Sequence, residues 1–130
     1  MKILDLVLKH KWYDMEESGE KPEEYRALTP YWFARLCVYK ECGHFYRKVT
    51  QKDAELFKAN HDGFASSVKR EINGVFSNLL PMDYTHVRIR RGYTNTTTLF
   101  KCEGITIGKG NPEWGAPEEE VFIIKLGERV

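Results

Sequence analysis

Residues 18–26 read SGEKPEEYR, and this stretch groups four residues suited to holding an anion. They are Gly19, Lys21, Glu24 and Arg26. Glu24 and Arg26 are two positions apart on a strand predicted over 22–28, so their side chains project from the same face. With Lys21 just before them, they would form a group able to hold a phosphate or the edge of a base. The stretch predicts either the rim of a nucleotide- or RNA-binding cleft or a solvated strand face, and spacing alone favours the solvated face.

The elements expected to position this group are an N-terminal strand and a short helix. Residues 3–9 alternate apolar and polar side chains, which predicts a strand. Residues 10–18 predict a helix in which Trp12 and Met15, one turn apart, face inward. Gly19 is suited to end that helix, because glycine adopts a left-handed backbone without a steric penalty. The charged stretch is therefore expected directly after a strand–helix unit.

The middle of the chain changes to a helical period. Residues 31–36 fit either a helical turn or an extended segment. Thr50 and Asp53 resemble an N-cap pair that opens a helix. Apolar residues then recur at helical spacing over 64–79, after which a proline ends the helix. These patterns predict a helical insertion at about 40–80.

The last third of the chain is predicted to be β-structure. Strands are expected over 85–93, over 96–110 with a break or bulge at Gly104, and over 121–126. A loop rich in glycine and proline fills 110–120. Short strands joined by turns favour an α+β fold, a small and mostly antiparallel β-barrel with flanking helices, over a parallel α/β sheet.

Length and composition indicate one globular domain over 1–130. Hydrophobic residues make up 42% and charged residues 30%, and the net charge is +1, so any binding of nucleic acid must come from a local basic patch. No apolar run approaches the roughly 20 residues of a membrane helix. Asp5 interrupts the apolar stretch that a signal peptide would need. Three cysteines, few and odd in number, fit a reducing compartment, and we expect a cytoplasmic protein with no membrane partner.

A second group of candidate binding residues follows in the β-rich part. Alternation places His86, Arg88 and Arg90 on one strand face, which could follow a phosphate backbone or could be a solvated face, with no preference between the two. The Tyr93 hydroxyl could line the same cleft as the motif, although a simple turn is the more common use of such a residue. Trp114, in a loop, is expected to form a pocket wall that can stack a base.

Metal ligands and cofactors are not expected. Cys37, Cys42 and His44 give the spacing C-x4-C-x-H, which lacks a fourth ligand and matches no zinc pattern. The acidic residues 118–120 have no spacing typical of a cation site. The chain has no glycine-rich phosphate loop and no nucleophile elbow.

The motif G-x-K-x-x-E-x-R, formed by the four residues of the opening stretch, resembles the signature of the ASCH domains. The order of strand, helix, motif and closing strands is also similar to that family. The tail RGYTNTTTLFKCEGITIGKGNPEWGAPEEEVFIIKLGE resembles the second half of small bacterial and phage members. The resemblance covers roughly 1–36 and 84–128 and does not extend to the insertion.

The resemblance implies a PUA-like barrel with a cleft beside the motif for RNA or a nucleotide-derived ligand. It implies Lys21 and Arg26 as anion contacts, with Arg88 and Arg90 extending the positive surface. Some family members are amidohydrolases acting on an acylated cytidine, and others are ribonucleases. The amidohydrolases carry a threonine nucleophile three positions after the lysine, where this chain has Glu24, and a carboxylate can activate water but cannot replace that hydroxyl.

Two functions therefore remain open on the sequence. The first is a binding module for RNA or a nucleotide that uses the motif cleft. The alternative is a hydrolase of the same fold, a ribonuclease or an amidohydrolase on a modified nucleoside, with Lys21 and Glu24 as its acid–base pair.

Overall fold

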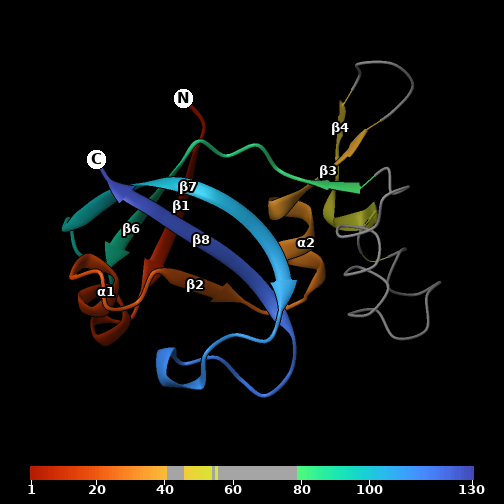
Figure 1. Cartoon of the computed structure of the whole chain (residues 1–130). Coiled ribbons are helices and arrows are strands. Elements are labelled where there is room, and N and C mark those ends of the chain that lie inside the picture. The colour runs from red at the N-terminus through yellow and green to blue at the C-terminus, as the bar shows by residue number, and fades with distance from the viewer. Residues whose placement is uncertain (41–45, 54, 56–78) are drawn as a thin grey trace.

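The computed structural model describes residues 1–40, 46–53, 55 and 79–130. A curled sheet, with helices at two of its corners, forms a half-barrel (Figure 1). The elements in chain order are β1 (Ile3–Leu8), α1 (His10–Glu17), β2 (Glu23–Arg26), α2 (Pro30–Leu36), β3 (Cys37–Lys40), β4 (Tyr46–Lys48), β5 (Leu79–Pro81), β6 (His86–Arg91), β7 (Thr97–Gly108), the 3-10 helix η1 (Pro112–Trp114) and β8 (Val121–Arg129).

The main sheet has five strands in the order β1-β6-β7-β8-β2. β1 pairs with β6 in parallel, and the other three pairings are antiparallel. The predicted α+β class and the mostly antiparallel sheet are therefore confirmed. The sheet does not close into the expected full barrel, because β1 and β2 are its two edges and do not pair with each other.

The core lies inside the curl of this sheet. β1 buries every second residue, as its alternation predicts, and β6 does the same. β8 is buried on both faces over its first four residues, which fits an interior strand between β7 and β2. The fully buried apolar side chains include Leu4, Val87, Ile89, Phe122 and Ile124.

β7 contains the irregularity that was predicted for it. The pairing register between β7 and β8 shifts on both sides of Cys102, and Gly104 has a φ of 129°. Residues that carry a side chain rarely adopt that backbone conformation, so the glycine lets the strand bend at this point. The bend curls the sheet around the core.

Helix α1 buries a face that was predicted only in part. Tyr13 and Glu16 are its buried residues, whereas Trp12 and Met15 are partly buried, and of these two Trp12 packs against the core. The prediction gave the inward face to apolar side chains alone, but Glu16 is buried with a hydrogen bond from Lys21. Gly19 follows the helix with a φ of 87°, as expected of a glycine that ends it.

The segment predicted as a helical insertion contains β-structure at both ends. β3, β4 and β5 form a small sheet in the order β4-β3-β5. Leu79 and Pro81 lie in β5 rather than at the end of a helix, so that part of the prediction was wrong. Pro81 is tolerated because β5 is an edge strand. Most of the helix predicted over 64–79 lies outside the described residues.

Two local predictions in this region have clear outcomes. The undecided segment 31–36 is helical, since α2 begins at Pro30 after Thr29, whose hydroxyl accepts a hydrogen bond from the backbone N–H of Trp32. Thr50 and Asp53 form the expected reciprocal cap, in which each side chain accepts from the backbone N–H of the other, at 3.1 and 3.0 Å. Within the described part of the chain, no helix has the length and apolarity needed to span a bilayer.

Candidate functional site

A cleft of about 280 Å³ lies at the open side of the half-barrel, between β1 and β2. We call it the motif cleft. Its lining includes Trp12, Lys21, Glu24, Tyr25, Arg26 and Trp114. The cleft thus brings three of the motif residues to the place where the sheet leaves its two edges unpaired.

Lys21 lies beneath the floor of the motif cleft, with 1% of its surface exposed. Its ammonium group donates to Glu16 Oε2 at 2.9 Å, to Glu24 Oε1 at 2.8 Å and to the backbone carbonyl of Glu23 at 2.7 Å. A lysine ammonium has three protons, and all three are engaged here. Lys21 therefore holds the carboxylates in place instead of presenting its charge at the mouth of the cleft.

Arg26 is the motif cation that reaches the surface. Its Nη1 donates to Glu24 Oε2 at 2.7 Å and to the backbone carbonyl of Tyr25 at 2.9 Å. Its Nη2 reaches across the open side of the sheet to the carbonyl of Val7 on β1, at 3.3 Å. The side chain is 17% exposed, so a guanidinium fixed on three sides retains an accessible face.

Glu16 belongs to this cluster, although it was not among the residues predicted from the sequence. Its carboxyl is fully buried, and its Oε1 has no hydrogen-bond partner among the described residues. Burial raises the pKa of Glu16 well above its ordinary value, the nearby Glu24 carboxylate raises it further, and Lys21 lowers it by less. These effects favour the protonated, neutral form of Glu16. The cleft lining includes the cations Lys9, Lys21 and Arg26 and one carboxylate, Glu24, so its charge is net positive.

The sequence did contain a signal for Glu16. It lies three positions after Tyr13 on α1, so both residues face the sheet. A lysine that is buried needs more than one acceptor, and a carboxylate on the inward face of the preceding helix is the nearest source. The assumption that inward positions are apolar hid this residue.

Aromatic rings surround the cluster. The Lys21 ammonium lies 5.1 Å from the centre of the Tyr25 ring and 5.8 Å from that of Trp12. Arg26 lies 5.1 Å from the centre of the Trp32 ring. Such contacts between cations and ring faces stabilise the charges where water is excluded. The motif cleft thus has a charged floor and aromatic walls.

The loop between β7 and β8 forms the far wall of the motif cleft. The Tyr25 hydroxyl accepts from the backbone N–H of Asn111 at 3.0 Å and donates to Glu23 at 2.8 Å, which ties the loop to β2. Burial raises the pKa of Tyr25 to about 12, so this hydroxyl stays protonated at neutral pH. Gly115 has a φ of 87°, and a Cβ there would lie 2.6 Å from the Trp12 ring. The loop therefore packs directly against Trp12 and carries Trp114 into the cleft wall.

The other predicted binding residues do not line the motif cleft. Arg88 forms an ion pair with Asp5 on β1, at 2.5 and 3.0 Å. Arg90 donates to the backbone carbonyl of Thr94 at 2.9 Å. The Tyr93 side chain is almost fully exposed in the turn after β6. None of these three residues lines the motif cleft, although Arg90 lies opposite Val7, which does.

The cysteine and histidine residues considered as metal ligands are only partly described. Cys37 is buried in the core, and burial raises the pKa of its thiol. Cys42 and His44 lie outside the described residues. Within the described ranges, no three His, Cys, Asp or Glu side chains are grouped closely enough to hold a metal ion.

Comparison with known proteins adds no further assignment. No family model, no curated protein and no solved structure matches the chain.

Proposed function

We propose that this protein binds RNA or a nucleotide-derived ligand in the motif cleft, as the resemblance to ASCH domains implies. The observation that supports the proposal is the position of Arg26. Its guanidinium is fixed by Glu24 and by two backbone carbonyls and keeps one accessible face, in a net positive cleft with aromatic walls. Because the group is already oriented, little conformational entropy is lost when it binds a phosphate or a base edge.

The walls of the cleft suit a base. Trp12, Tyr25 and Trp114 all line it, and stacking of a base on an aromatic side chain contributes about 1–3 kcal/mol. A volume of about 280 Å³ is at the lower end for ligand pockets, which favours a single nucleotide unit in the cleft over a larger ligand. Lys9 also lines the cleft and is exposed, so it adds a mobile cation at the rim.

Lys21 and Glu24 have a positioning role in this proposal. Lys21 holds Glu24, and Glu24 holds Arg26, so the motif residues form a chain that ends at the ligand-facing guanidinium. A direct phosphate contact by Lys21 would require the loss of one of its three hydrogen bonds. The contacts therefore follow the order of the residues in the sequence, from Lys21 to Glu24 to Arg26.

One observation favours the hydrolase alternative. Lys21 and Glu24 both line the motif cleft, and the Lys21 ammonium donates to Glu24 Oε1 at 2.8 Å. A cation and a carboxylate in contact within a cleft are groups that can act as a general acid and a general base. In such an enzyme Lys21 and Glu24 would form the acid–base pair acting on RNA or a modified nucleoside.

A gel experiment with end-labelled single-stranded RNA tests both functions. The protein is mixed with RNA at low salt, with and without divalent metal, and each sample is run on a native and a denaturing gel. We expect wild-type protein to shift intact RNA. We expect Arg26→Ala to weaken the shift by about tenfold or more, because it removes a charged hydrogen-bonding group.

Arg88→Ala is the matched control, since it removes an exposed arginine of the same sheet that does not line the cleft. Equal effects of Arg26→Ala and Arg88→Ala would refute binding in the motif cleft. Shortened RNA in the wild-type lanes, with intact RNA in the Glu24→Gln lanes, would establish the hydrolase. No shift and no shortening would remove RNA as the ligand.

A further inference from the structure

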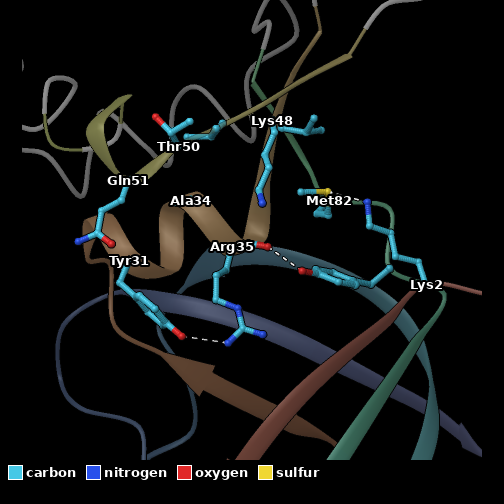
Figure 2. A pocket seen from close by; sticks show the side chains of 11 residues that line it. Lys2, Tyr31, Ala34, Arg35, Lys48, Thr50, Gln51 and Met82 are labelled. Carbon is cyan, nitrogen blue, oxygen red and sulfur yellow. Dashed lines mark hydrogen bonds between the residues drawn. The ribbon is translucent and has the colours of Figure 1, made fainter.

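A second pocket, larger than the motif cleft, lies between helix α2 and the small sheet (Figure 2). Its volume is about 740 Å³. We call it the Arg35 pocket. Its lining includes the polar residues Lys2, Tyr31, Arg35, Lys48, Gln51 and Tyr84. None of the residues that line the motif cleft lines this pocket.

The charge of the Arg35 pocket is one-sided. Its lining contains the three cations Lys2, Arg35 and Lys48, and none of its described lining residues is Asp or Glu. The motif cleft differs, since Glu24 is part of its lining. A concave surface lined by cations alone concentrates the field and attracts anions.

Arg35 is held in place without a carboxylate. Its Nη1 donates to the Tyr31 hydroxyl at 3.1 Å, and its Nη2 donates to the carbonyl of Asp5 at 3.5 Å. Its guanidinium also lies 5.3 Å from the centre of the Trp32 ring. At the base of the side chain, the Tyr84 hydroxyl donates to the Arg35 carbonyl at 2.9 Å. Each of these partners is uncharged, so the positive charge of Arg35 is oriented and is not neutralised by any of the described residues.

Lys48 and Lys2 contribute cations from other elements. Lys48, at the end of β4, is exposed, and its side chain makes no hydrogen bond or ion pair with any described residue. Figure 2 shows its side chain extending into the pocket from above Arg35. Lys2, just before β1, is shared with Asp83, at 3.2 Å, and with the Met82 sulfur. At least two of the three charges are therefore available to a ligand.

We propose that the Arg35 pocket binds the phosphate group of a nucleotide. Arg35 and Lys48 would hold the phosphate through charge-assisted hydrogen bonds. The rings of Tyr31 and Tyr84 would contact the base or sugar, and the Gln51 side-chain carbonyl offers an acceptor for a base edge, while its Nε2 donates to Glu55 Oε1 at 3.4 Å. The site is separate from the motif cleft, and the inference does not depend on what that cleft binds.

Isothermal titration calorimetry of the whole chain tests this inference with three probes. They are adenosine 5′-monophosphate, adenosine, and a single-stranded oligoadenylate RNA. We expect the monophosphate to bind about tenfold or more tightly than adenosine, because the phosphate meets charged donors. Equal affinities for the two, or no binding of the monophosphate, would overturn the inference.

Two lysine variants locate the site. Lys48→Ala is expected to weaken monophosphate binding by about tenfold, because it removes one charged partner of the phosphate. Lys125→Ala is the control, since Lys125 is also an exposed strand lysine and lines neither pocket. Lys125→Ala is expected to leave the affinity unchanged. Equal effects of the two variants would overturn the inference. Because Lys48 is exposed, Lys48→Ala is expected to fold like the wild type.

Arg26→Ala separates this inference from the proposed function. If Arg26→Ala abolishes monophosphate binding and Lys48→Ala does not, the ligand lies in the motif cleft and the Arg35 pocket is refuted as its site. If only Lys48→Ala weakens binding, the Arg35 pocket is established whatever the RNA gel shows. The oligoadenylate then identifies the source of the phosphate. If Lys48→Ala lowers the affinity for the oligoadenylate more than the affinity for the monophosphate, the ligand of the pocket is RNA. If it lowers both affinities equally, the ligand is a free nucleotide.

Discussion

The motif cleft and the Arg35 pocket differ in how far their positive charges are paired with carboxyl groups. In the motif cleft, Lys21 and Arg26 are bound by carboxylates on adjacent elements, and Lys21 is completely buried. In the Arg35 pocket, Arg35 has uncharged partners among the described residues and Lys48 is exposed, while Lys2 pairs with the Asp83 carboxylate. The first arrangement fixes geometry, and the second leaves charge available to a ligand.

The comparison shows what a sequence motif marks in this fold. The regularly spaced G-x-K-x-x-E-x-R residues lie where charges have been taken into the core, and such charges need defined partners. The residues of the Arg35 pocket come from α2, β3, β4 and segments outside the labelled helices and strands, and they form no pattern along the chain. A spaced motif therefore identifies the more constrained of the two sites and says nothing about the other.

The largest difference between the two sites is expected in stability. Lys21→Ala should lower the free energy of unfolding by about 3–5 kcal/mol, because it leaves buried carboxyl groups without their counter-ion. Lys48→Ala should change it by less than about 0.5 kcal/mol, as is usual for an exposed side chain. Urea denaturation of both variants measures this. Similar losses in the free energy of unfolding would show that Lys21 and Lys48 contribute equally to stability.

The dependence of stability on pH should come from the motif cleft. The pKa of Glu16 is raised to about 9 from an ordinary 4.5. Between these values the unfolded chain has released a proton that the folded chain keeps, so the free energy of unfolding falls as the pH rises. The stabilisation is complete below about pH 4.5 and is lost towards pH 9.

Glu16→Gln should remove this fall, because an amide does not titrate. The wild-type protein is expected to lose on the order of 1 kcal/mol per pH unit more than the variant in this window. Urea denaturation at pH 5, 6, 7 and 8 measures the difference. Lys48→Ala, in the other pocket, should follow the wild-type slope. Parallel curves for Glu16→Gln and the wild type would mean that Glu16 is ionised at neutral pH.

A smaller effect is expected at the wall of the motif cleft. Gly115→Ala places a Cβ 2.6 Å from the Trp12 ring, at a φ of 87°. The strained backbone and the displaced ring should lower stability by about 1–3 kcal/mol. RNA binding in the motif cleft should weaken while nucleotide binding in the Arg35 pocket stays unchanged. Tryptophan fluorescence and the two binding assays measure these effects, and a parallel loss at both sites would show that the sites are coupled.

The smallest effect is expected outside both sites. Arg88→Ala breaks an exposed ion pair with Asp5, and exposed pairs contribute little to stability. The urea midpoint and the affinities for RNA and for nucleotide should all stay close to those of the wild type. A clear loss of RNA binding would restore the basic strand face as part of the binding surface.

The parts of the fold that sequence could predict are those with a simple local period. The alternation of β1 and β6, the apolar β8 and the bend at Gly104 all follow from which side chains are apolar or absent. The same reasoning failed for Glu16 of α1, because its buried partner is Lys21, five positions on and outside the helix. It also failed for β5, because a strand of three residues carries too little pattern to be recognised.

The candidate site was predictable only within one stretch of sequence. The motif residues converge because β2 itself brings Glu24 and Arg26 to one face. Arg88 and Arg90 also share a face, but it is on the outer side of the sheet, which alternation alone does not distinguish from the cleft side. The Arg35 pocket depends on how distant elements pack, and local spacing contains no information about that.

One consequence of the open half-barrel concerns self-association. Asp5 and Val7 are two apart on β1, so their carbonyls point the same way, toward the edge that has no partner strand among the described residues. An unpaired edge of this kind can add a strand from another molecule and begin aggregation. Here Arg35 donates to the first carbonyl and Arg26 to the second. The two arginines that serve the two pockets thus occupy the hydrogen-bonding positions of a missing strand, and they keep the edge of the sheet closed to other copies of the chain.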